Sequence, residues 1–363
     1  MYDYLIVGAG LFGSVFARQM TDAGAKCYVI DRRNHIAGNC FSEKINNINV
    51  HKYGPHIFHT NNSTIWQYIN NYTEFNNFTY RPKVWNSGKL YSFPINMMTL
   101  YQLWGVTSPR EAEVRLNKSK VKINDPQNLE EYALSQIGRE IYEKFFYGYT
   151  KKQWGKEPSE LPTSIIKRIP IRLTFDDNYF NDRYQGIPIN GYTEVIAKLL
   201  NNIPYDINVD YLSDKYIFNK LAKTIIYTGK IDEFHNYSLG ELEWRSLNFK
   251  HITKEKKDYQ GVAAINYTDD RIPFTRIIEH KHFNNDVSEQ TIITKEYPQK
   301  WDKSKESFYP VNDEKNNNLY KEYRKLTTEV KTIFAGRLGS YKYYNMDQVI
   351  GSALHKSNQE VNK

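Results

Sequence analysis

The chain has 363 residues, of which 40% are hydrophobic and 25% are charged. This length allows two or three domains, and the composition is typical of a globular protein and excludes a disordered chain. The net charge of +8 favours anionic ligands. The lysines are scattered and no nucleic-acid-binding motif is present, so we expect no nucleic-acid partner, and a nucleotide diphosphate is a sufficient anionic ligand.

The start of the chain carries no basic segment followed by an apolar one, so we expect no signal peptide. The longest apolar stretch, residues 4–16, is too short and too rich in glycine to span a bilayer, and no stable membrane insertion is expected. Cys27 and Cys40 lack the spacing of a metal or CxxC site. We interpret both as reduced thiols of a cytoplasmic protein.

The first elements form a predicted βαβ unit. Residues 4–7 are a continuous apolar run, which predicts a strand buried on both faces, as in a parallel sheet. Residues 11–23 have helical periodicity, and residues 27–30 predict a second buried strand that ends at Asp31. The three pieces together predict a right-handed crossover unit.

The rest of the chain changes in character twice. Residues 94–148 show apolar side chains at helical spacing and predict a small helical insertion. A β pattern follows, which predicts an antiparallel sheet with strands at 242–249, 262–267, 274–279 and 291–294. Residues 224–229 and 332–336 each end in glycine and predict further strands of the parallel sheet, whose carboxyl ends face a ligand crevice.

These patterns predict an α/β fold with a discontinuous Rossmann-like dinucleotide-binding domain, a small helical domain and an antiparallel β-sheet domain. The predicted dinucleotide-binding domain comprises residues 1–75, 192–232 and 311–363. The helical domain is assigned to residues 94–158, and the sheet domain to residues 76–93, 159–191 and 233–310.

Residues 8–13, Gly-Ala-Gly-Leu-Phe-Gly, match the dinucleotide motif GxGxxG between the first predicted strand and the helix. Gly8 permits the tight turn, Gly10 lets the backbone approach the pyrophosphate, and Gly13 allows close contact between helix and strand. The phosphates then face the N–H groups at the helix N-terminus. Asp31 can accept hydrogen bonds from the ribose hydroxyls.

The motif fits NAD as well as FAD, and two features favour FAD. Residues 32–39 are basic and small, and they resemble the second signature of flavin families, with Ala37 in place of the first glycine of the usual pair. Residues 335–337, Ala-Gly-Arg, suit the point where a flavoprotein chain returns to the flavin end of the cofactor.

Several longer segments resemble one family, the bacterial UDP-galactopyranose mutases. They include HKYGPHIFH at 51–59 and GYTKKQWG at 148–155, and the others lie at 167–170, 176–180, 275–283, 309–313 and 336–344. The matches run in order through nearly the whole chain. The resemblance implies a flavin-dependent isomerase that interconverts UDP-galactopyranose and UDP-galactofuranose, with N5 of reduced FAD as the nucleophile at the sugar C1.

The resemblance also assigns residues to the substrate. It implies that Arg168 and Arg276 hold the diphosphate, which planar guanidinium groups bind well. Phe145 and Tyr149 resemble the residues that stack on uracil, although Phe145 also fits the core side of a helix. Trp154 falls on a predicted mobile loop that closes over the substrate. The remaining substrate residues implied are Tyr179, Asn266, Tyr309 and Tyr343.

For the cofactor, the resemblance places His59 and His56 beside the flavin, where His59 tunes its reactivity. The pair could suggest a metal site, but no third ligand stands nearby and we expect no metal. A helix that starts at Met346 should direct backbone N–H groups at the flavin. The full cofactor set is Gly8, Gly10, Phe12, Gly13, Asp31, Arg32, Gly38, Asn39, His56, Ile57, Gly229, Arg337, Met346, Asp347, Gln348 and Val349.

Two other functions remain open on sequence grounds. A flavin oxidase or desaturase explains the nucleotide-binding motifs but not the arginines and tyrosines of the later segments. A non-catalytic binding protein on a flavoprotein-like scaffold needs no cofactor at all. The resemblance further implies a homodimer, an unidentified flavin reductant and a role in supplying galactofuranose for cell-surface polysaccharide. Asn345 stands where the family commonly has Asp, which affects sugar contacts or rate rather than the fold.

Overall fold

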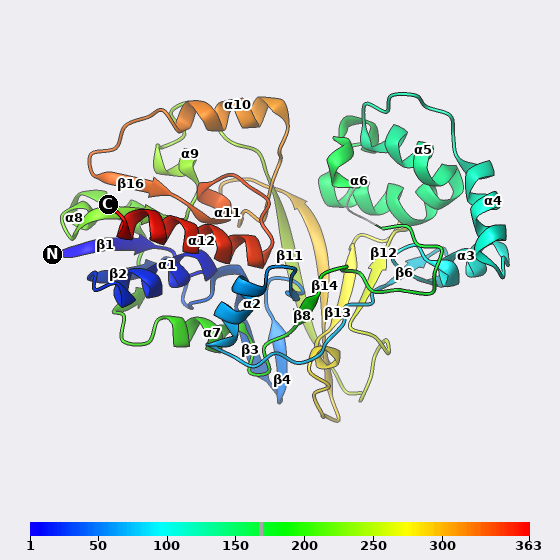
Figure 1. The fold of residues 1–363 in the computed structure, drawn as a ribbon, viewed down its shortest axis with the longest axis horizontal. Helices are drawn as coiled ribbons and strands as arrows, with labels where there is room; N and C mark the ends of the chain where they lie inside the picture. Colours follow the sequence, from blue (N-terminus) through cyan, green and yellow to red (C-terminus); the bar gives the residue numbers. More distant parts are fainter. Residues whose placement is uncertain (167–169) are drawn as a thin grey trace.

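The computed structural model describes residues 1–166 and 170–363, and three parts follow one another along its long axis (Figure 1). At one end lies a five-stranded sheet in the order β16-β10-β1-β2-β9, with every pair parallel. Its strands are β1 (Tyr2–Val7), β2 (Cys27–Asp31), β9 (Tyr205–Ile207), β10 (Ala222–Tyr227) and β16 (Lys331–Phe334). The predicted α/β class and Rossmann-like sheet are confirmed.

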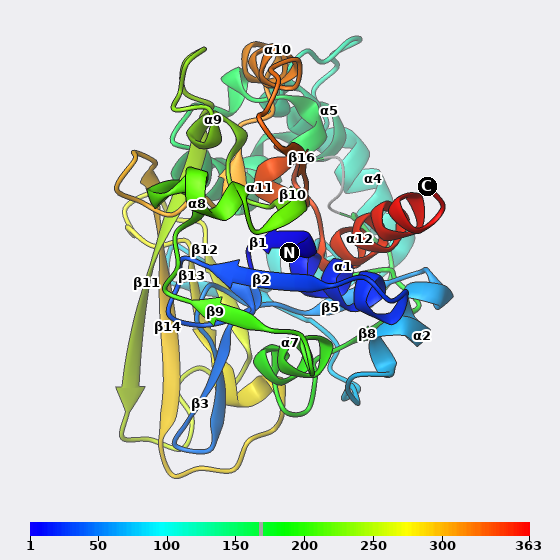
Figure 2. The same ribbon diagram turned by 90° about the vertical axis from the view of Figure 1, so that its left-hand side faces the viewer.

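Helices cover both faces of this sheet, which explains why its central strands are apolar without alternation. On one face α1 (Leu11–Asp22) and α12 (Met346–Val361) pack along each other, with α7 (Tyr192–Leu199) beside α1. Figure 2 shows α1 and α12 side by side next to β1 and β2. The other face carries α8 (Lys215–Asn219) and α9 (Ile231–Phe234), around fully buried Leu5, Ile30 and Ile225.

The second sheet occupies the middle of the molecule and has seven strands in the order β15-β11-β14-β13-β12-β6-β7. Their bounds are β6 (Lys83–Asn86), β7 (Lys89–Ser92), β11 (Trp244–Lys254), β12 (Ala264–Tyr267), β13 (Arg276–Glu279), β14 (Thr291–Lys300) and β15 (Tyr309–Pro310). The expected antiparallel pairing holds except between β12 and β6, which are parallel. The sequence pattern predicted β11, β12, β13 and β14 but not β6, β7 or β15, and it could not show this parallel pairing.

Smaller strand pairs join the first two parts. The β3 (Ser42–Ile45) and β4 (Ile48–His51) hairpin contacts β14, and β5 (Phe58–Thr60) pairs with β8 (Tyr184–Gly186). Two further helices, α2 (Ser63–Asn70) and α10 (Glu314–Tyr323), and the short α11 (Gly336–Gly339) complete this region.

The third part is helical and has a core of its own. It consists of α3 (Met97–Trp104), α4 (Pro109–Ser119), α5 (Leu129–Tyr142), a π-helical turn (Glu143–Tyr147) and α6 (Gly148–Trp154). Trp154 is the last residue of α6 and not part of a loop, so that prediction was wrong. Gly155 adopts a left-handed conformation (φ 63°) and ends the helix directly after Trp154.

Among the described residues, no helix is both long and apolar enough to cross a membrane. Cys27 and Cys40 are buried and form no disulfide. Burial raises the pKa of the Cys27 thiol to about 11 and that of Cys40 to about 12, so both are neutral.

A group of buried histidines joins the β3–β4 hairpin to the central sheet. The backbone N–H of His51 donates to Nδ1 of His280 (3.2 Å), and the N–H of His56 donates to Nδ1 of His51 (3.2 Å). Thr294 Oγ1 lies 2.6 Å from His280 Nε2 and 2.7 Å from His251 Nδ1. Burial lowers the pKa of His51 to about 3 and those of His56 and His251 to about 4, so these rings are neutral.

These histidines should make the protein less stable in acid. In the unfolded chain each one titrates near its ordinary pKa of about 6.5. The unfolded state therefore binds more protons as the pH falls below about 6.5, and the free energy of unfolding decreases between about pH 6.5 and pH 4. Denaturant midpoints at about pH 7 and about pH 5 measure this loss.

Replacing one member of the group provides the check. The pKa of His280 is also lowered, mainly by burial, so His280→Gln should reduce the difference between the two midpoints. His355→Gln, at an exposed position on α12, is the matched control. A pH difference as large in His280→Gln as in the wild type would contradict this account.

Candidate active site

The glycine motif forms a tight turn between the end of β1 and the start of α1. Gly8 has φ 113°, a conformation that side chains other than glycine rarely adopt, and its N–H donates to Ile30 O (2.7 Å). A Cβ on Gly13 would lie 2.0 Å from Gly8 O, so α1 and β1 approach as closely as the motif predicts. Gly10 is the N-cap of α1 and Phe12 is buried beneath the turn. The N–H groups of the first turn of α1 are left for an anion.

Asp31 braces the turn from the end of β2. One carboxylate oxygen accepts from the N–H of Ala9 (2.8 Å) and the other from the N–H of Arg33 (2.9 Å). Each oxygen keeps a second lone pair, so the predicted ribose contact is compatible with this bracing. The sequence did not reveal that the same carboxylate also fixes the glycine turn.

The segment after β2 is held by an acid that the sequence analysis missed. Glu306 lies 2.8 Å from Arg33 Nη2 and 3.4 Å from Arg32 Nη2, and Arg32 also pairs with Glu233 (3.4 Å). Arg33 donates to Asn39 Oδ1 (3.0 Å). Glu306 is 273 residues away from Arg33, and no local pattern connects the two.

Two glycines of the predicted cofactor set lie beside this segment. A Cβ on Gly38, which has φ 52°, would lie 3.1 Å from Gly10 Cα, so the two loops touch through glycine alone. Gly229 follows β10, and a Cβ there would lie 2.7 Å from the hydroxyl of Tyr227. Both positions bring bare backbone to the carboxyl edge of the parallel sheet, where a nucleotide binds.

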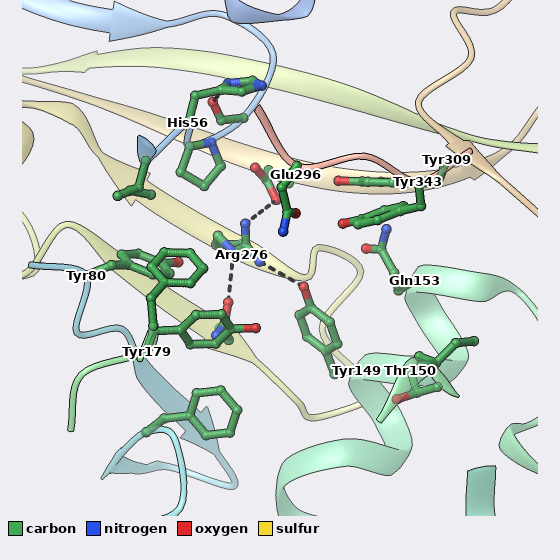
Figure 3. A pocket seen from close by; sticks show the side chains of 18 of the residues that line it. His56, Tyr80, Tyr149, Thr150, Gln153, Tyr179, Arg276, Glu296, Tyr309 and Tyr343 are labelled. Atoms are coloured by element: carbon green, nitrogen blue, oxygen red, sulfur yellow. Dashed lines mark hydrogen bonds and ion pairs between the residues drawn. The ribbon is translucent and has the colours of Figure 1, made fainter. Parts of the chain in front are cut away.

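A cavity of about 520 Å³ opens where the three parts of the molecule meet. This volume is in the range of small-molecule sites, and its walls mix aromatic with polar side chains. Figure 3 shows tyrosines from several elements around a central arginine. The predicted site residues that line it are Asn39, His56, Ile57, His59, Phe145, Tyr149, Trp154, Tyr179, Asn266, Arg276, Tyr309, Arg337, Tyr343 and Met346.

Arg276 is at the centre of this cavity, and three side chains fix its guanidinium group (Figure 3). Its Nε donates to Asn266 Oδ1 (2.8 Å), its Nη2 donates to Tyr149 Oη (3.0 Å), and its Nη1 lies 3.5 Å from Glu296. Burial opposes the charge of Arg276, but Tyr149 and Glu296 outweigh it and raise its pKa further. Burial raises the pKa of Glu296, and Arg276 offsets part of that shift.

Tyrosine hydroxyls surround the arginine. The rings of Tyr309 and Tyr343 stack 5.4 Å apart, and the guanidinium of Arg337 lies 5.9 Å and 5.3 Å from them. Burial raises the pKa of Tyr149 and of Tyr309, so both remain protonated hydrogen-bond donors. Tyr179 lines the opposite wall.

Tyr80, which the sequence analysis did not single out, stands beside Tyr179 with ring centroids 5.4 Å apart. The N–H of Tyr179 donates to Tyr80 O (2.8 Å), so the two segments that carry these rings are tied together. The only sequence signal at Tyr80 is an aromatic residue among many others.

The aromatic residues assigned to uracil come from the helical part. Phe145 lies in the π-helical turn, is 2% exposed, and packs edge-on against Tyr91 (5.2 Å). Phe145 therefore belongs to the core of the helical part and also lines the cavity, so its core placement is confirmed and its stacking on uracil stays a prediction. Tyr149 and Trp154 lie on α6, which runs along one wall.

The two histidines take different roles. His56 Nδ1 lies 2.9 Å from Gly54 O, and because Nδ1 must donate in this bond, Nε2 of the neutral ring is an acceptor. His59 Nδ1 lies 2.7 Å from Asp182 Oδ2, and its ring stacks on Phe180 (3.7 Å). Asp182 was missed by the sequence analysis, since it reaches His59 only through the pairing of β5 and β8.

The helix expected at Met346 begins there as α12, with a capping box formed by Asn345 and Gln348. Asp347 accepts from Thr60 Oγ1 (3.0 Å), while its other carboxylate oxygen is buried with no partner in the described structure. Val349 faces the core. Met346 and Asn345 line the cavity, so the free N–H groups of this helix start at its edge.

Arg168 lies outside the described residues. The flanking residues Ile166 and Pro170 both line the cavity.

The residues present fit a flavin dinucleotide. Gly8 and Gly38 have positive φ and leave little room for a Cβ, and the N-termini of α1 and α12 provide N–H groups for an anionic or polar ligand. A buried carboxylate oxygen of Asp347 and the buried Nε of Arg337 are polar atoms without a partner among the described residues. Such atoms are the ones that a bound polar ring system satisfies.

Comparisons with known proteins show which family the chain resembles. Residues 144–343 match the family model of UDP-galactopyranose mutase, and residues 6–72 match an NAD(P)-binding Rossmann-like domain. The chain is 41% identical to a probable UDP-galactopyranose mutase of Klebsiella pneumoniae over 98% of this chain and 94% of that protein. It is 39% identical to a dTDP-fucopyranose mutase of Escherichia coli over 98% of this chain and 97% of that protein.

Solved structures share the fold. A crystal structure of reduced UDP-galactopyranose mutase superposes with a TM-score of 0.78 at 14% sequence identity. The match covers 100% of this chain and 96% of the chain in that structure. The chain therefore has the fold of that enzyme.

The bracing of the glycine turn by Asp31 gives a testable expectation. Asp31→Ala leaves the N–H of Ala9 without its acceptor, so the purified protein should lose most of its flavin absorbance while remaining folded by circular dichroism. Asp206→Ala, an exposed acid on the neighbouring β9, is the matched control and should keep its flavin. A full flavin complement in Asp31→Ala would show that the brace is dispensable.

Proposed function

The chain belongs to the UDP-galactopyranose mutase family, and from this premise we propose that it interconverts UDP-galactopyranose and UDP-galactofuranose with FAD as its cofactor. The single observation that carries the proposal is Arg276, held in the cavity by Asn266, Tyr149 and Glu296. Two of its five N–H groups donate to Asn266 and Tyr149, and Nη1 pairs with Glu296. Further N–H groups remain for the oxygens of a diphosphate.

The chemistry divides between the cofactor and the chain. When bound in its reduced form, FAD would supply N5 as a nucleophile toward the sugar C1. The chain binds the departing diphosphate: Arg276 stabilises its charge, and the protonated hydroxyls of Tyr149 and Tyr309 donate hydrogen bonds to it. We assign the same role to Tyr179, Tyr343 and Arg168, the last on the resemblance of its segment.

Further residues act around this centre. We propose that Phe145 and Trp154 enclose the uracil and that His59, oriented by Asp182, lies beside the flavin. Closure of the cavity by the helical part would keep water from the reacting sugar. The cofactor is held by the glycine turn, by Asp31 and by the start of α12.

Family membership argues against both earlier alternatives. The relatives are named as mutases, which are isomerases, and neither an oxidase nor a non-catalytic protein accounts for the match at residues 144–343. We further propose a cytoplasmic homodimer that receives electrons from an unidentified reductant and supplies galactofuranose for surface polysaccharide.

A second candidate substrate comes from the relative named dTDP-fucopyranose mutase, which is almost as similar as the one named for UDP-galactopyranose. Both names share a nucleoside diphosphate linked to a six-carbon sugar. They differ at the pyrimidine and at the sugar, which are the parts of the ligand away from Arg276.

One assay tests the proposal against these options. Dithionite-reduced protein is incubated with UDP-galactofuranose, and products are separated by chromatography. We expect UDP-galactopyranose with no stoichiometric use of reductant, and no product from the oxidised protein. The furanose form of dTDP-fucose, tested in parallel, should react at least about tenfold more slowly by kcat/KM, a difference of about 1.4 kcal/mol. Faster reaction of the dTDP-sugar would overturn the substrate assignment, and reductant consumption would indicate an oxidoreductase.

Arg276→Ala should lower kcat/KM by about 100-fold or more, since a charge-assisted bidentate contact to the diphosphate is lost. The flavin spectrum should be retained. The variant leaves Glu296 buried without its counter-charge, so the neutral double variant Arg276→Met, Glu296→Gln serves to separate folding from activity. Arg110→Ala, at an exposed position on α4 of the helical part, is the matched control. Wild-type turnover in Arg276→Ala would refute the diphosphate assignment.

A further inference from the structure

Lys152 has an unusual environment on α6. Its ammonium group donates to four backbone carbonyls of one loop, those of Tyr267 (2.8 Å), Asp269 (2.8 Å), Ile272 (3.0 Å) and Phe274 (3.1 Å). An ammonium group has three hydrogens, so at least one of them is shared between two of the four carbonyls. The loop thus surrounds the charge as it would surround a bound cation. Among the described residues, no side-chain acid lies in contact with the amine.

The wrapped loop closes the hairpin that carries the diphosphate residues. It joins β12 to β13, and Asn266 and Arg276 are cross-strand partners at the end of that hairpin. Lys152 therefore binds the backbone of the loop immediately beyond the Asn266–Arg276 pair. Any shift of this loop relative to α6 moves Arg276.

The other end of the linkage is Tyr149. It precedes Lys152 by three residues on α6, and its hydroxyl accepts the hydrogen bond from Arg276. Figure 3 shows Tyr149 projecting from this helix toward the arginine. Lys152 and Tyr149 thus connect the same helix to the same hairpin, one through the loop and one through the guanidinium.

Two more contacts press α6 against this loop and against β11. Gly148 allows close approach, because a Cβ there would lie 2.1 Å from Thr268 O. At the helix end, Arg245 of β11 donates to Gln153 O (2.9 Å) and to Lys152 O (3.2 Å). The helix is therefore fixed at both ends, and Lys152 supplies the charge that holds the loop between them.

We propose that Lys152 is a positioning residue: its ammonium holds the β12–β13 loop against α6 and so sets Arg276 and Tyr149 for the nucleotide diphosphate. This inference rests on the proposed function, because it concerns the same ligand. It adds a residue that touches neither substrate nor cofactor and acts through the loop.

The main test compares two adjacent lysines. Lys152→Met keeps the length of the side chain and removes its charge and donors. We expect its Kd for UDP, measured by calorimetry on the oxidised flavoprotein, to rise at least about tenfold, or about 1.4 kcal/mol. KM of the reduced enzyme should rise with it, with a smaller change in kcat and an unchanged flavin spectrum. The matched control is Lys151→Met, whose exposed amine pairs with Glu157 (2.5 Å) and should change Kd less than twofold.

A second variant protects the test against a folding defect. Gly148→Ala keeps the Lys152 amine but wedges a methyl group against Thr268 O. It should raise the Kd for UDP in the same direction. If Lys152→Met and Gly148→Ala both bind UDP within twofold of the wild type, while the melting temperature falls, the role is structural only and the proposal is overturned.

A pH profile adds a readout that a structural role does not move. Burial lowers the pKa of Lys152 to about 8, while Asp269 and Asp270 of the loop oppose that shift. Two other charged side chains belong to the elements packed against it: Arg271 of the loop, which pairs with Asp269, and Arg245 of β11, which donates to Lys152 O. The wild-type affinity for UDP should decline as the pH rises through about 8, because the amine loses its charge. In Lys152→Met the profile should be flat, and a decline retained there would assign it to another group.

The same measurements keep the two proposals apart. If the wild-type protein binds UDP but forms no mutase product, the proposed reaction is contradicted. The Kd of Lys152→Met for UDP then still tests the positioning role. Wild-type protein that does not bind UDP refutes both.

Discussion

The site depends on a partly buried guanidinium group that is paired with a buried carboxylate. Glu296 lies opposite Arg276 across β13 and β14, so the charge pair is set by strand register. Removing a charge from such a pair costs about 3–5 kcal/mol, because the other charge is left buried without a partner. The sheet therefore fixes Arg276 before any ligand arrives, and the arginine loses little conformational freedom on binding.

Three parts of the fold meet at this pair. The parallel sheet brings the glycine turn and the start of α12 to one edge of the cavity, the central sheet brings Arg276 and Tyr309, and the helical part brings Tyr149 (Figure 1). No single part contains a complete site. A dinucleotide and a nucleotide sugar can thus be held by different parts, with their reactive ends directed at a shared space.

The sequence predicted the elements with local signals. The βαβ unit, the glycine motif and the start of α12 follow from apolar runs, turn residues and capping residues, and the structure contains all three. What sequence reasoning missed is pairing over long separations. Asp182 meets His59, and Glu306 meets Arg33, only because strands far apart in the chain lie together. Trp154 shows the opposite limit: a glycine that ends a helix was interpreted as a loop, since both use the same residue.

The charge balance in the cavity bears on Arg168, which lies outside the described residues. The charged side chains among the described lining residues, histidines aside, are Arg276, Arg337, Glu296 and Asp182, two of each sign. The diphosphate of a nucleotide sugar carries two negative charges, and burying them without compensation is costly. Hydroxyl donors reduce this cost but cannot cancel a charge. A further cation is therefore required, and Arg168, whose neighbours Ile166 and Pro170 line the cavity, is the residue that the resemblance assigns to that role. The electrostatic argument calls for a cation but does not select one, and the resemblance alone assigns this role to Arg168.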